Sequence, residues 1–243
     1  MNLSGNTILI SGGASGIGLA WAKAFAEKGN KVILLGRSQQ KLEEVAKLGF
    51  HIIKCDLEVQ EEIEAAVLEL GNKYPNLNCL INNAGVQFNY SFSGTAIPFE
   101  KIRKEININL TGQIILTQLL IPLLNTQKQA TIINTTSALG AFPKSNGLVY
   151  SAAKSGLRNF TIGLKNSLNS SSINVLEFIP PVTATPMTEG RKEAVLLPED
   201  LIAEVLPQLQ KDYRLLTTSK VRFFLWVAFL FPNLAYKILH KNL

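Results

Sequence analysis

The chain has 243 residues, and 24 Lys and Arg against 18 Asp and Glu give it a formal net charge of +6. Hydrophobic residues make up 47% of the sequence and charged residues 17%, which excludes an intrinsically disordered chain. Its two cysteines, Cys55 and Cys79, lie in apolar runs and are too few for a disulfide framework or a cysteine metal cluster. Since no signal-peptide pattern is present, we expect a reducing, cytoplasmic compartment.

Short apolar runs alternate with segments of helical periodicity along most of the chain. The predicted strands are 6–11, 31–35, 51–55, 79–81, 130–134 and 173–178. The predicted helices between them are 17–28, 41–48, 59–74, 99–124 and 150–168. Continuously apolar strands that alternate with helices are typical of a parallel sheet covered on both faces. The sequence therefore predicts one α/β domain over 1–243, a doubly wound parallel sheet of the Rossmann type.

After Pro180 this alternation weakens. Residues 186–212 are predicted to form a loop followed by a helix at Glu199–Leu209. Because the insertion follows the carboxyl end of a strand, where open α/β sheets bind ligands, we expect a mobile lid there.

A glycine-rich turn, SGGASGIG, lies between the first strand and the first helix. Gly12 permits the tight turn, Gly16 lets the backbone approach a pyrophosphate, and Gly18 allows close packing of helix and strand. Ser15 and Ile17 belong to the same turn, where free N–H groups and the positive end of the helix dipole would face phosphates. The spacing GxxxGxG differs from the commoner GxGxxG, and a tight turn without a ligand is the alternative.

The second strand ends in Leu35-Gly36-Arg37-Ser38, which contains no carboxylate. NAD-selective enzymes place an acid there for the ribose 2′-hydroxyl, whereas a guanidinium matches a 2′-phosphate. Arg37 therefore favours NADP(H) and does not exclude NAD(H). The alternative is that Arg37 is a solvated surface cation.

Tyr150 and Lys154 open a predicted helix and lie on one face of it, four residues apart. The nearby ammonium is expected to lower the pKa of Tyr150 from about 10, which makes the phenol a candidate general acid/base. Ser137 follows the strand at 130–134, and its hydroxyl could hydrogen-bond a substrate carbonyl oxygen. A helix or turn cap is the alternative role for this serine.

Together these motifs resemble the short-chain dehydrogenase/reductase superfamily in its single-domain form, from about Asn6 to Met187. SGGASGIG is similar to the family's TGxxxGxG, and Asn82-Asn83-Ala84-Gly85 is similar to its NNAG signature. The stretch after Pro180 looks similar to the DltE-like branch. It departs from the family's PGxVxT at Pro181, which fixes φ, so the turn must be built differently.

The resemblance implies further site residues and a reaction. The implied cofactor contacts are Asp56 and Leu57 at the adenine, Asn83, Ala84 and Gly85 in the signature, and Thr183 and Thr185 near the carboxamide and the phosphates. Tyr150 would transfer the hydroxyl proton while C4 of the nicotinamide gives or takes hydride. Lys154 would hold the ribose hydroxyls, Ser137 would polarise the substrate oxygen, and Asn109 would hold a water that links Lys154 to solvent.

The implied activity is an NADP(H)-preferring oxidoreductase acting on a small-molecule carbonyl or secondary alcohol. A non-catalytic NADP(H)-binding regulator is the alternative. Aromatic and apolar side chains are candidates for a substrate pocket, with ordinary packing as the alternative. They are Phe88, Tyr90, Phe92, Phe142 and Met187.

The last 24 residues, 220–243, carry four cations and no acid, so the rest of the chain is nearly neutral, which argues against a nucleic-acid-binding surface. They include the run VRFFLWVAFLF, which Pro232 ends and which is too short to span a membrane. Since the family resemblance implies a homo-dimer or homo-tetramer, we expect this run to be buried against the domain or a partner subunit. Peripheral membrane contact and a role in substrate access are the alternatives.

Overall fold

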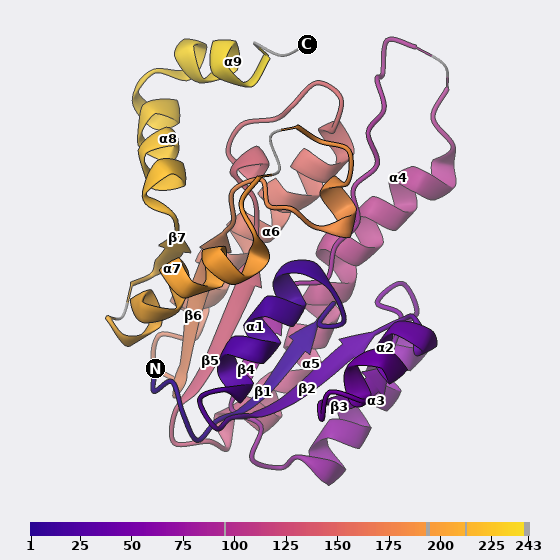
Figure 1. The fold of residues 1–243 in the computed structure, drawn as a ribbon, viewed down its shortest axis with the longest axis vertical. Coiled ribbons are helices and arrows are strands. Elements are labelled where there is room, and N and C mark those ends of the chain that lie inside the picture. Colours follow the sequence, from indigo (N-terminus) through magenta and orange to yellow (C-terminus); the bar gives the residue numbers. More distant parts are fainter. Residues whose placement is uncertain (95, 193–194, 212, 241–243) are drawn as a thin grey trace.

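Seven strands in the described part of the chain form one parallel sheet in the order β3-β2-β1-β4-β5-β6-β7 (Figure 1). A computed structural model describes residues 1–94, 96–192, 195–211 and 213–240, without the side chains of 238–240. The strands are β1 Thr7–Ser11, β2 Lys31–Gly36, β3 His51–Lys54, β4 Cys79–Asn82, β5 Ala130–Thr135, β6 Ile173–Ile179 and β7 Leu215–Thr217. The first six match the predicted strands, and β7 was not predicted because three residues give too short a pattern.

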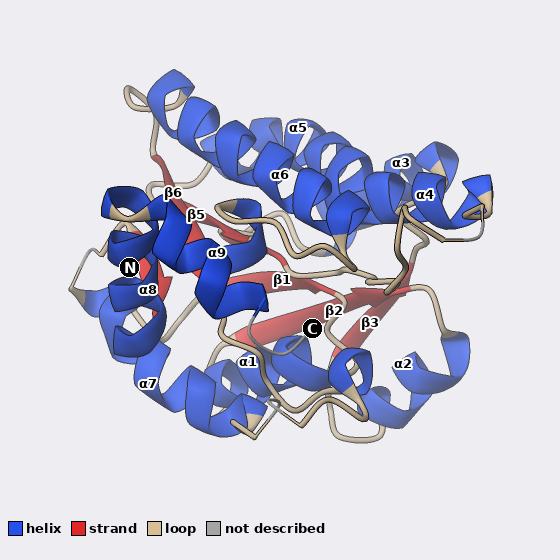
Figure 2. Cartoon of the chain, turned by 90° about the horizontal axis from the view of Figure 1, so that it is seen from above, coloured by secondary structure: helices blue, strands red, loops and turns tan. Residues whose placement is uncertain are grey.

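Helices cover both faces of this sheet (Figure 2). One face carries α1 Gly16–Ala26, α2 Gln39–Ala46 and α7 Pro198–Gln210, and the other carries α3 Gln60–Lys73, α4 Phe99–Ile106, α5 Gly112–Asn125 and α6 Leu148–Ser167. Successive strand residues alternate between the two cores: Ile8 and Ile10 pack with α1, while Leu9 packs with α3 and α5. The predicted doubly wound Rossmann-type fold is confirmed.

The predicted helix 99–124 is interrupted by a π-helical turn at Asn107–Thr111, between α4 and α5. The span Phe99–Asn125 is the one helix in the described part of the chain with the length and mean hydropathy, 1.3, of a membrane span. Such a match is weak by itself, because core helices share these properties. Leu116, Leu120 and Leu124 of this span are fully buried in the core that α5 forms with α3.

The predicted lid at 186–212 is wrong in its second half. Helix α7 packs along α1, and its side chains Leu201, Ile202 and Val205 are buried in the core. Only the segment before α7, with a short 3-10 turn at Pro186–Thr188, lies at the carboxyl end of the sheet. The apolar periodicity of α7 belongs to the packed layer rather than to a movable cover.

The chain ends in two helices, α8 Ser219–Leu230 and α9 Pro232–His240, which stand away from the sheet (Figure 1). Val227 and Ala228 of α8 are buried, whereas most of its large apolar side chains are exposed. Burial against the domain is therefore seen for one side of α8 only, since one layer of contacts buries only one side of a helix, and burial of the other side against a partner subunit stays a prediction.

Candidate active site

An elongated cleft of about 540 Å³ lies at the carboxyl ends of the strands. It sits where the chain order reverses, between β1 and β4, which is the usual ligand position in open α/β sheets. Most predicted site residues line it: Gly12, Ser15, Gly16, Ile17, Arg37, Asp56, Leu57, Asn83, Ala84, Gly85, Tyr150, Lys154 and Thr185. Gly18, Asn109, Ser137 and Thr183 are not among the lining residues.

The glycine turn is fixed to the loop after β4 by Ser11. Its Oγ accepts hydrogen bonds from the main-chain N–H groups of Asn83 (2.9 Å) and Ala84 (3.1 Å). Gly12 has φ +64°, and a Cβ there would lie 2.8 Å from Ala84 Cα, so only glycine fits. A Cβ at Gly18 would collide with the Gly12 carbonyl oxygen, so Gly18 packs directly against the turn. Its contact is with the protein, and it does not line the cleft.

The amino end of α1 is open toward the cleft. Ser15 occupies the N-cap position without capping the helix through its side chain, and the first turn carries no acid. Gly16 has φ +53°, and a Cβ there would lie 3.0 Å from Thr185 Cγ2 across the cleft. Free N–H groups with the positive end of the helix dipole could hold a diphosphate at this point.

Two cations line the end of the cleft beside β2. Arg37 was predicted, while Lys41, in the first turn of α2, was missed. Its backbone N–H donates to Ser38 Oγ (3.4 Å), the cap that begins α2 there. Asp56 and Leu57 line the same end, where the resemblance places the adenine. Lys41 reaches the cleft because α2 begins at the Ser38 cap. The sequence pattern alone therefore did not identify Lys41 as a cofactor-binding residue.

Asn109 lies in the π-helical turn and is completely buried. Its Oδ1 accepts from the Val86 N–H (2.9 Å), and its Nδ2 donates to the Val86 carbonyl (2.8 Å). A Cβ at Gly85 would lie 2.9 Å from this Oδ1. Asn109 thus holds the loop after β4 in place, and its implied water-binding role stays a prediction.

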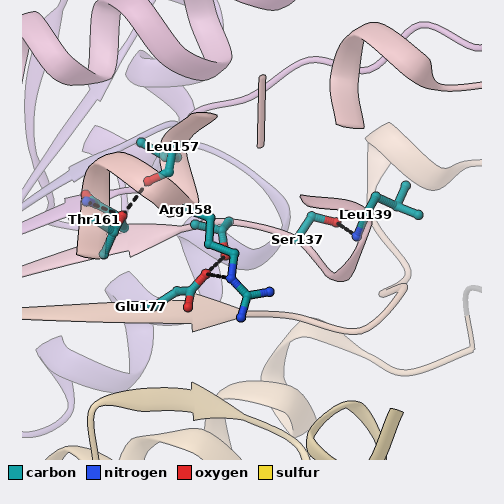
Figure 3. Close-up of polar contacts among 8 residues, drawn as sticks. Ser137, Leu139, Leu157, Arg158, Thr161 and Glu177 are labelled. Carbon is teal, nitrogen blue, oxygen red and sulfur yellow. Dashed lines mark hydrogen bonds and ion pairs between the residues drawn. The ribbon is translucent and has the colours of Figure 1, made fainter. Parts of the chain in front are cut away.

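Tyr150, Lys154 and Ser137 come together at the other end of the cleft. Ser137 caps a 3-10 turn, with its Oγ accepting from the Leu139 N–H (3.2 Å; Figure 3), and its hydroxyl acts on the Tyr150 phenol by lowering the pKa of that phenol. The cap role of Ser137 is therefore seen in the structure, and its role toward a substrate oxygen stays a prediction. The Lys154 Nζ donates to the Thr135 carbonyl (2.7 Å) and lies 5.9 Å from the centre of the Tyr150 ring.

Burial dominates the acidity of both groups. It raises the pKa of Tyr150 to about 12, and the hydrogen bond from Ser137 and the charge of Arg191 offset this only in part. Burial lowers the pKa of Lys154 to about 7. The expected lowering of the Tyr150 pKa is therefore wrong for this structure, because both groups are desolvated together.

Behind Ser137, the half-buried carboxylate of Glu177 contacts the residue that follows β5. The Thr136 Oγ1 donates to Glu177 Oε1 (2.7 Å), and Arg158 Nε lies 3.6 Å from the same oxygen (Figure 3). Burial raises the pKa of Glu177, while Thr136 and Arg158 act in the opposite direction. This contact ties β6 and α6 to the strand end that carries Ser137.

The outer wall contains residues that the sequence reasoning missed. Gln87 lines the cleft and accepts a hydrogen bond from Arg191 Nη2 (3.0 Å), which lies beyond Met187 in the segment before α7. Glu105, fully buried, accepts from the Phe88 N–H (2.8 Å) and from the Tyr90 hydroxyl (2.5 Å). These contacts join positions far apart in the sequence, so no local pattern signals them.

The candidate pocket residues divide into two groups. Phe88 and Met187 line the cleft, whereas Phe92 is exposed and packs beside Tyr90, with ring centres 6.1 Å apart. Phe142 contacts Tyr236 of α9 edge to face, with ring centres 5.1 Å apart. The last helix of the chain therefore reaches the loop that follows Ser137.

Thr183 is buried and bonded within its own turn. Its Oγ1 donates to the Pro181 carbonyl (2.9 Å), and its carbonyl accepts from Thr188 Oγ1 (2.5 Å). The Thr185 N–H donates to the same Thr188 hydroxyl (3.0 Å). These hydrogen bonds among Thr183, Thr185 and Thr188 hold the turn after β6, where Pro181 replaces the glycine of the PGxVxT pattern.

Known proteins resemble this chain over most of its length. The sequence model of the family described as short chain dehydrogenase matches residues 6–195. An uncharacterized oxidoreductase, DltE of Bacillus subtilis, is 35% identical over 195 residues, which cover 79% of this chain and 77% of that protein. A serine 3-dehydrogenase of Rhizobium radiobacter is 33% identical over 189 residues, covering 75% of this chain and 74% of the relative.

The fold has a close structural counterpart. A short chain dehydrogenase from Burkholderia cenocepacia, solved in complex with NADP, superposes with a TM-score of 0.87 at 20% identity. The superposition covers 99% of both chains, so it includes the two terminal helices. At 20% identity this superposition supports the fold alone. The family assignment is based on the sequence matches.

Proposed function

The chain belongs to the short-chain dehydrogenase family, and we propose that it is an NADP(H)-dependent oxidoreductase that interconverts a carbonyl and a secondary alcohol, with Tyr150 as general acid/base. The observation that carries this proposal is the meeting of Tyr150, Ser137 and Lys154 at one end of a cleft whose other end holds two cations. The serine 3-dehydrogenase relative, by its name, also acts on a hydroxyl-bearing carbon.

The cleft fits a dinucleotide by two features of its surface. The Gly12 and Gly16 positions leave a cradle that a side chain would fill, directly before the amino end of α1. Arg37 and Lys41 at the β2 end match a 2′-phosphate, which an acid in that place would repel. When bound, the nicotinamide supplies or accepts the hydride.

The residues at the nicotinamide end handle the proton. With its pKa raised to about 12, the Tyr150 phenol keeps its proton at neutral pH and can donate it to the oxygen of a carbonyl being reduced. Ser137 lies within hydrogen-bonding reach of the phenol, so a substrate oxygen beside Tyr150 would meet both hydroxyl groups. Lys154, with a pKa of about 7, can exchange its proton near neutral pH.

The test is turnover of a panel of aldehydes and ketones with NADPH and NADH in parallel. Tyr150→Phe should lower kcat by roughly 10²–10⁴-fold, because the proton donor is removed and the ring is kept. Tyr74→Phe, which makes the same change far from the cleft lining, should leave kcat unchanged. Wild-type activity that survives Tyr150→Phe would show that another group moves the proton.

The coenzyme preference is tested by the same assay. Since Arg37 and Lys41 line the end of the cleft that we assign to the adenosine part of the cofactor, kcat/KM should be higher with NADPH than with NADH. Equal values, or a preference for NADH, would contradict the role given to Arg37 and Lys41. Tight NADPH binding without turnover of any carbonyl or alcohol would favour the regulator instead of the enzyme.

A further inference from the structure

Six large apolar side chains of α8, α9 and the residue between them are exposed, and the spacing of Phe223, Trp226 and Leu230 places these three on one face of α8. This C-terminal apolar face consists of Phe223, Trp226, Phe229, Leu230, Phe231 and Leu234. Phe229 is 84% exposed and Trp226 is 56% exposed, which is unusual for aromatic residues grouped on one surface. A contiguous patch of this kind marks a binding surface.

The segment is an ordered part of the fold, held from its inner side. Val227, Ala228 and Ala235 are buried, and Tyr236 packs against Phe142. The Thr218 Oγ1 caps the start of α8 by accepting from the Val221 N–H (3.4 Å). The exposed face is therefore presented at a fixed place on the molecule.

The two terminal helices themselves carry charge of one sign, and the Glu204 carboxylate of α7 meets them only at the start of α8, where it accepts from the Ser219 N–H (3.3 Å). Lys220, Arg222 and Lys237 are exposed in the two helices, and residues 213–243 contain no Asp or Glu. Arg222 donates to the Leu215 carbonyl (3.0 Å), so it is already engaged on the protein, while the two lysines flank the face from α8 and α9. A partner that covers the face must therefore offer an apolar surface for the aromatic rings and negative charge for the lysines.

We propose that the C-terminal apolar face binds the surface of a membrane that contains anionic lipids. Trp and Phe side chains enter the boundary between headgroups and acyl chains, and lysines pair with anionic headgroups. A second copy of the chain seated on this face would instead bring the same cations toward one another, since a two-fold interface repeats one surface patch.

The geometry gives a helix pair that lies on the membrane rather than crossing it. The 12 residues of α8 extend about 18 Å, well short of a hydrocarbon core of about 30 Å. Pro232 begins α9 in a new direction, so the two helices do not form one continuous span (Figure 1). The exposed rings reach only the interfacial layer.

Helix α9 lies at the end of the molecule toward which the carboxyl ends of the strands point (Figure 1). Seen from above, α9 crosses over the carboxyl ends of the strands (Figure 2). The Phe142–Tyr236 contact links α9 to the loop that carries Ser137. Membrane binding through the terminal helices therefore acts on an element that contacts the loop after Ser137.

Tryptophan fluorescence gives a direct test with the full chain. The chain has two tryptophans, and Trp21 is fully buried in the α1 core, so a change on adding vesicles reports Trp226. Vesicles of phosphatidylcholine mixed with phosphatidylglycerol should shift the emission to the blue and sediment with the protein. Pure phosphatidylcholine vesicles should do so much less, and high salt should weaken the anionic binding. Trp226→Phe should still sediment and should lose the spectral shift.

Two matched pairs of variants test the two halves of the surface. Phe229→Glu should lower vesicle binding at least tenfold, whereas Leu68→Glu, the same change at an exposed leucine of α3, should not. Lys220→Gln with Lys237→Gln should weaken binding to anionic vesicles by roughly fivefold per lysine, while Lys47→Gln on the far side should not. Far-UV circular dichroism and the Tm show whether each variant is folded.

Three results would overturn the proposal. The first is that folded wild-type protein sediments with neither kind of vesicle. The second is that it binds neutral and anionic vesicles equally and without salt dependence. The third is that light scattering shows a wild-type oligomer that Phe229→Glu dissociates, with no vesicle binding, because a second copy would then cover the face.

Discussion

Tyr150 and Lys154 illustrate how burial acts on two neighbouring groups of opposite charge type. The spacing of four residues correctly predicts that they lie together, but it carries no information on depth. Both are almost completely buried, so the phenol is held protonated and the lysine loses much of its affinity for a proton. A protonated Tyr150 at neutral pH fits the proton-donor role that we propose for it in carbonyl reduction.

Arg191 adjusts this acidity from the segment before α7, and its removal should change the pH dependence of the reverse reaction. Its charge lowers the pKa of Tyr150, so Arg191→Gln should raise that pKa further. In the proposed mechanism alcohol oxidation needs Tyr150 to accept a proton, so the rise of the oxidation rate through the Tyr150 pKa, here called the alkaline limb, should move to higher pH by up to about one pH unit. The pH profile of kcat/KM for oxidation measures this shift.

A charge-conserving variant separates electrostatics from the loss of a contact. Arg191→Lys keeps the cation near Gln87 and should leave the alkaline limb where the wild type has it. If Arg191→Gln leaves the limb in place as well, Arg191 does not act on Tyr150.

The residues of the cleft differ in how far the sequence predicts them. Gly12 and Gly16 were predicted because a glycine-rich turn has local conformational demands, and Tyr150 and Lys154 because helical spacing makes them neighbours. Arg191 reaches Gln87 across 104 positions in the sequence, and only the folded chain brings them together. Long-range polar contacts of this kind are invisible to local patterns.

At the scale of elements, the apolar runs correctly predict six strands of the sheet. The two elements that differ from the prediction, the π-helical turn and α7, depend on contacts between distant parts of the chain. The π-helical turn at Asn107–Thr111 has an ordinary helical sequence, and the Asn109–Val86 contacts accompany it. Helix α7 was interpreted as part of a lid because it follows a loop, yet its apolar stripe packs on α1. Periodicity predicts that a helix forms, and it does not predict which surface the helix meets.

A buried polar network connects α5, β4, β5 and α6 through the middle of the sheet. The Asn82 Nδ2 donates to Thr117 Oγ1 (2.7 Å) and to Asn134 Oδ1 (2.8 Å), and Asn134 Nδ2 donates to Thr161 Oγ1 (2.9 Å). Asn134→Ala removes two of these bonds and leaves their partners buried. It should lower the free energy of unfolding by about 2–3 kcal/mol, measured by urea denaturation.

The control for this network is an asparagine with the same chemistry on the surface. Asn169→Ala, just beyond the end of α6, should change the free energy of unfolding by less than about 0.5 kcal/mol. A loss for Asn134→Ala no larger than this would show that the network does not stabilise the sheet.

At the scale of the whole molecule, charge and apolar surface are separated from the chemistry. The cleft lies in a nearly neutral body, and the excess of cations belongs to the terminal helices. The expected homo-dimer or homo-tetramer stays a prediction, and subunits that bind lipid through the C-terminal apolar face would have to contact one another elsewhere. A nearly neutral domain with basic and apolar terminal helices would be oriented by an anionic membrane surface, with the terminal helices toward the lipid.

Deleting residues 219–243 should therefore separate cofactor binding from substrate binding. The sheet is complete at Thr217, and every residue lining the cleft precedes this point, so NADPH should bind with unchanged Kd in a fluorescence titration.

Loss of the Phe142–Tyr236 contact should loosen the loop after Ser137 and raise the KM for a ketone by roughly two- to tenfold, the value of one aromatic pair. Tyr236→Ala should reproduce the higher KM, and Phe223→Ala, on the exposed face, should not. If the truncated chain loses NADPH binding together with its Tm, the terminal helices stabilise the whole fold rather than only the substrate end.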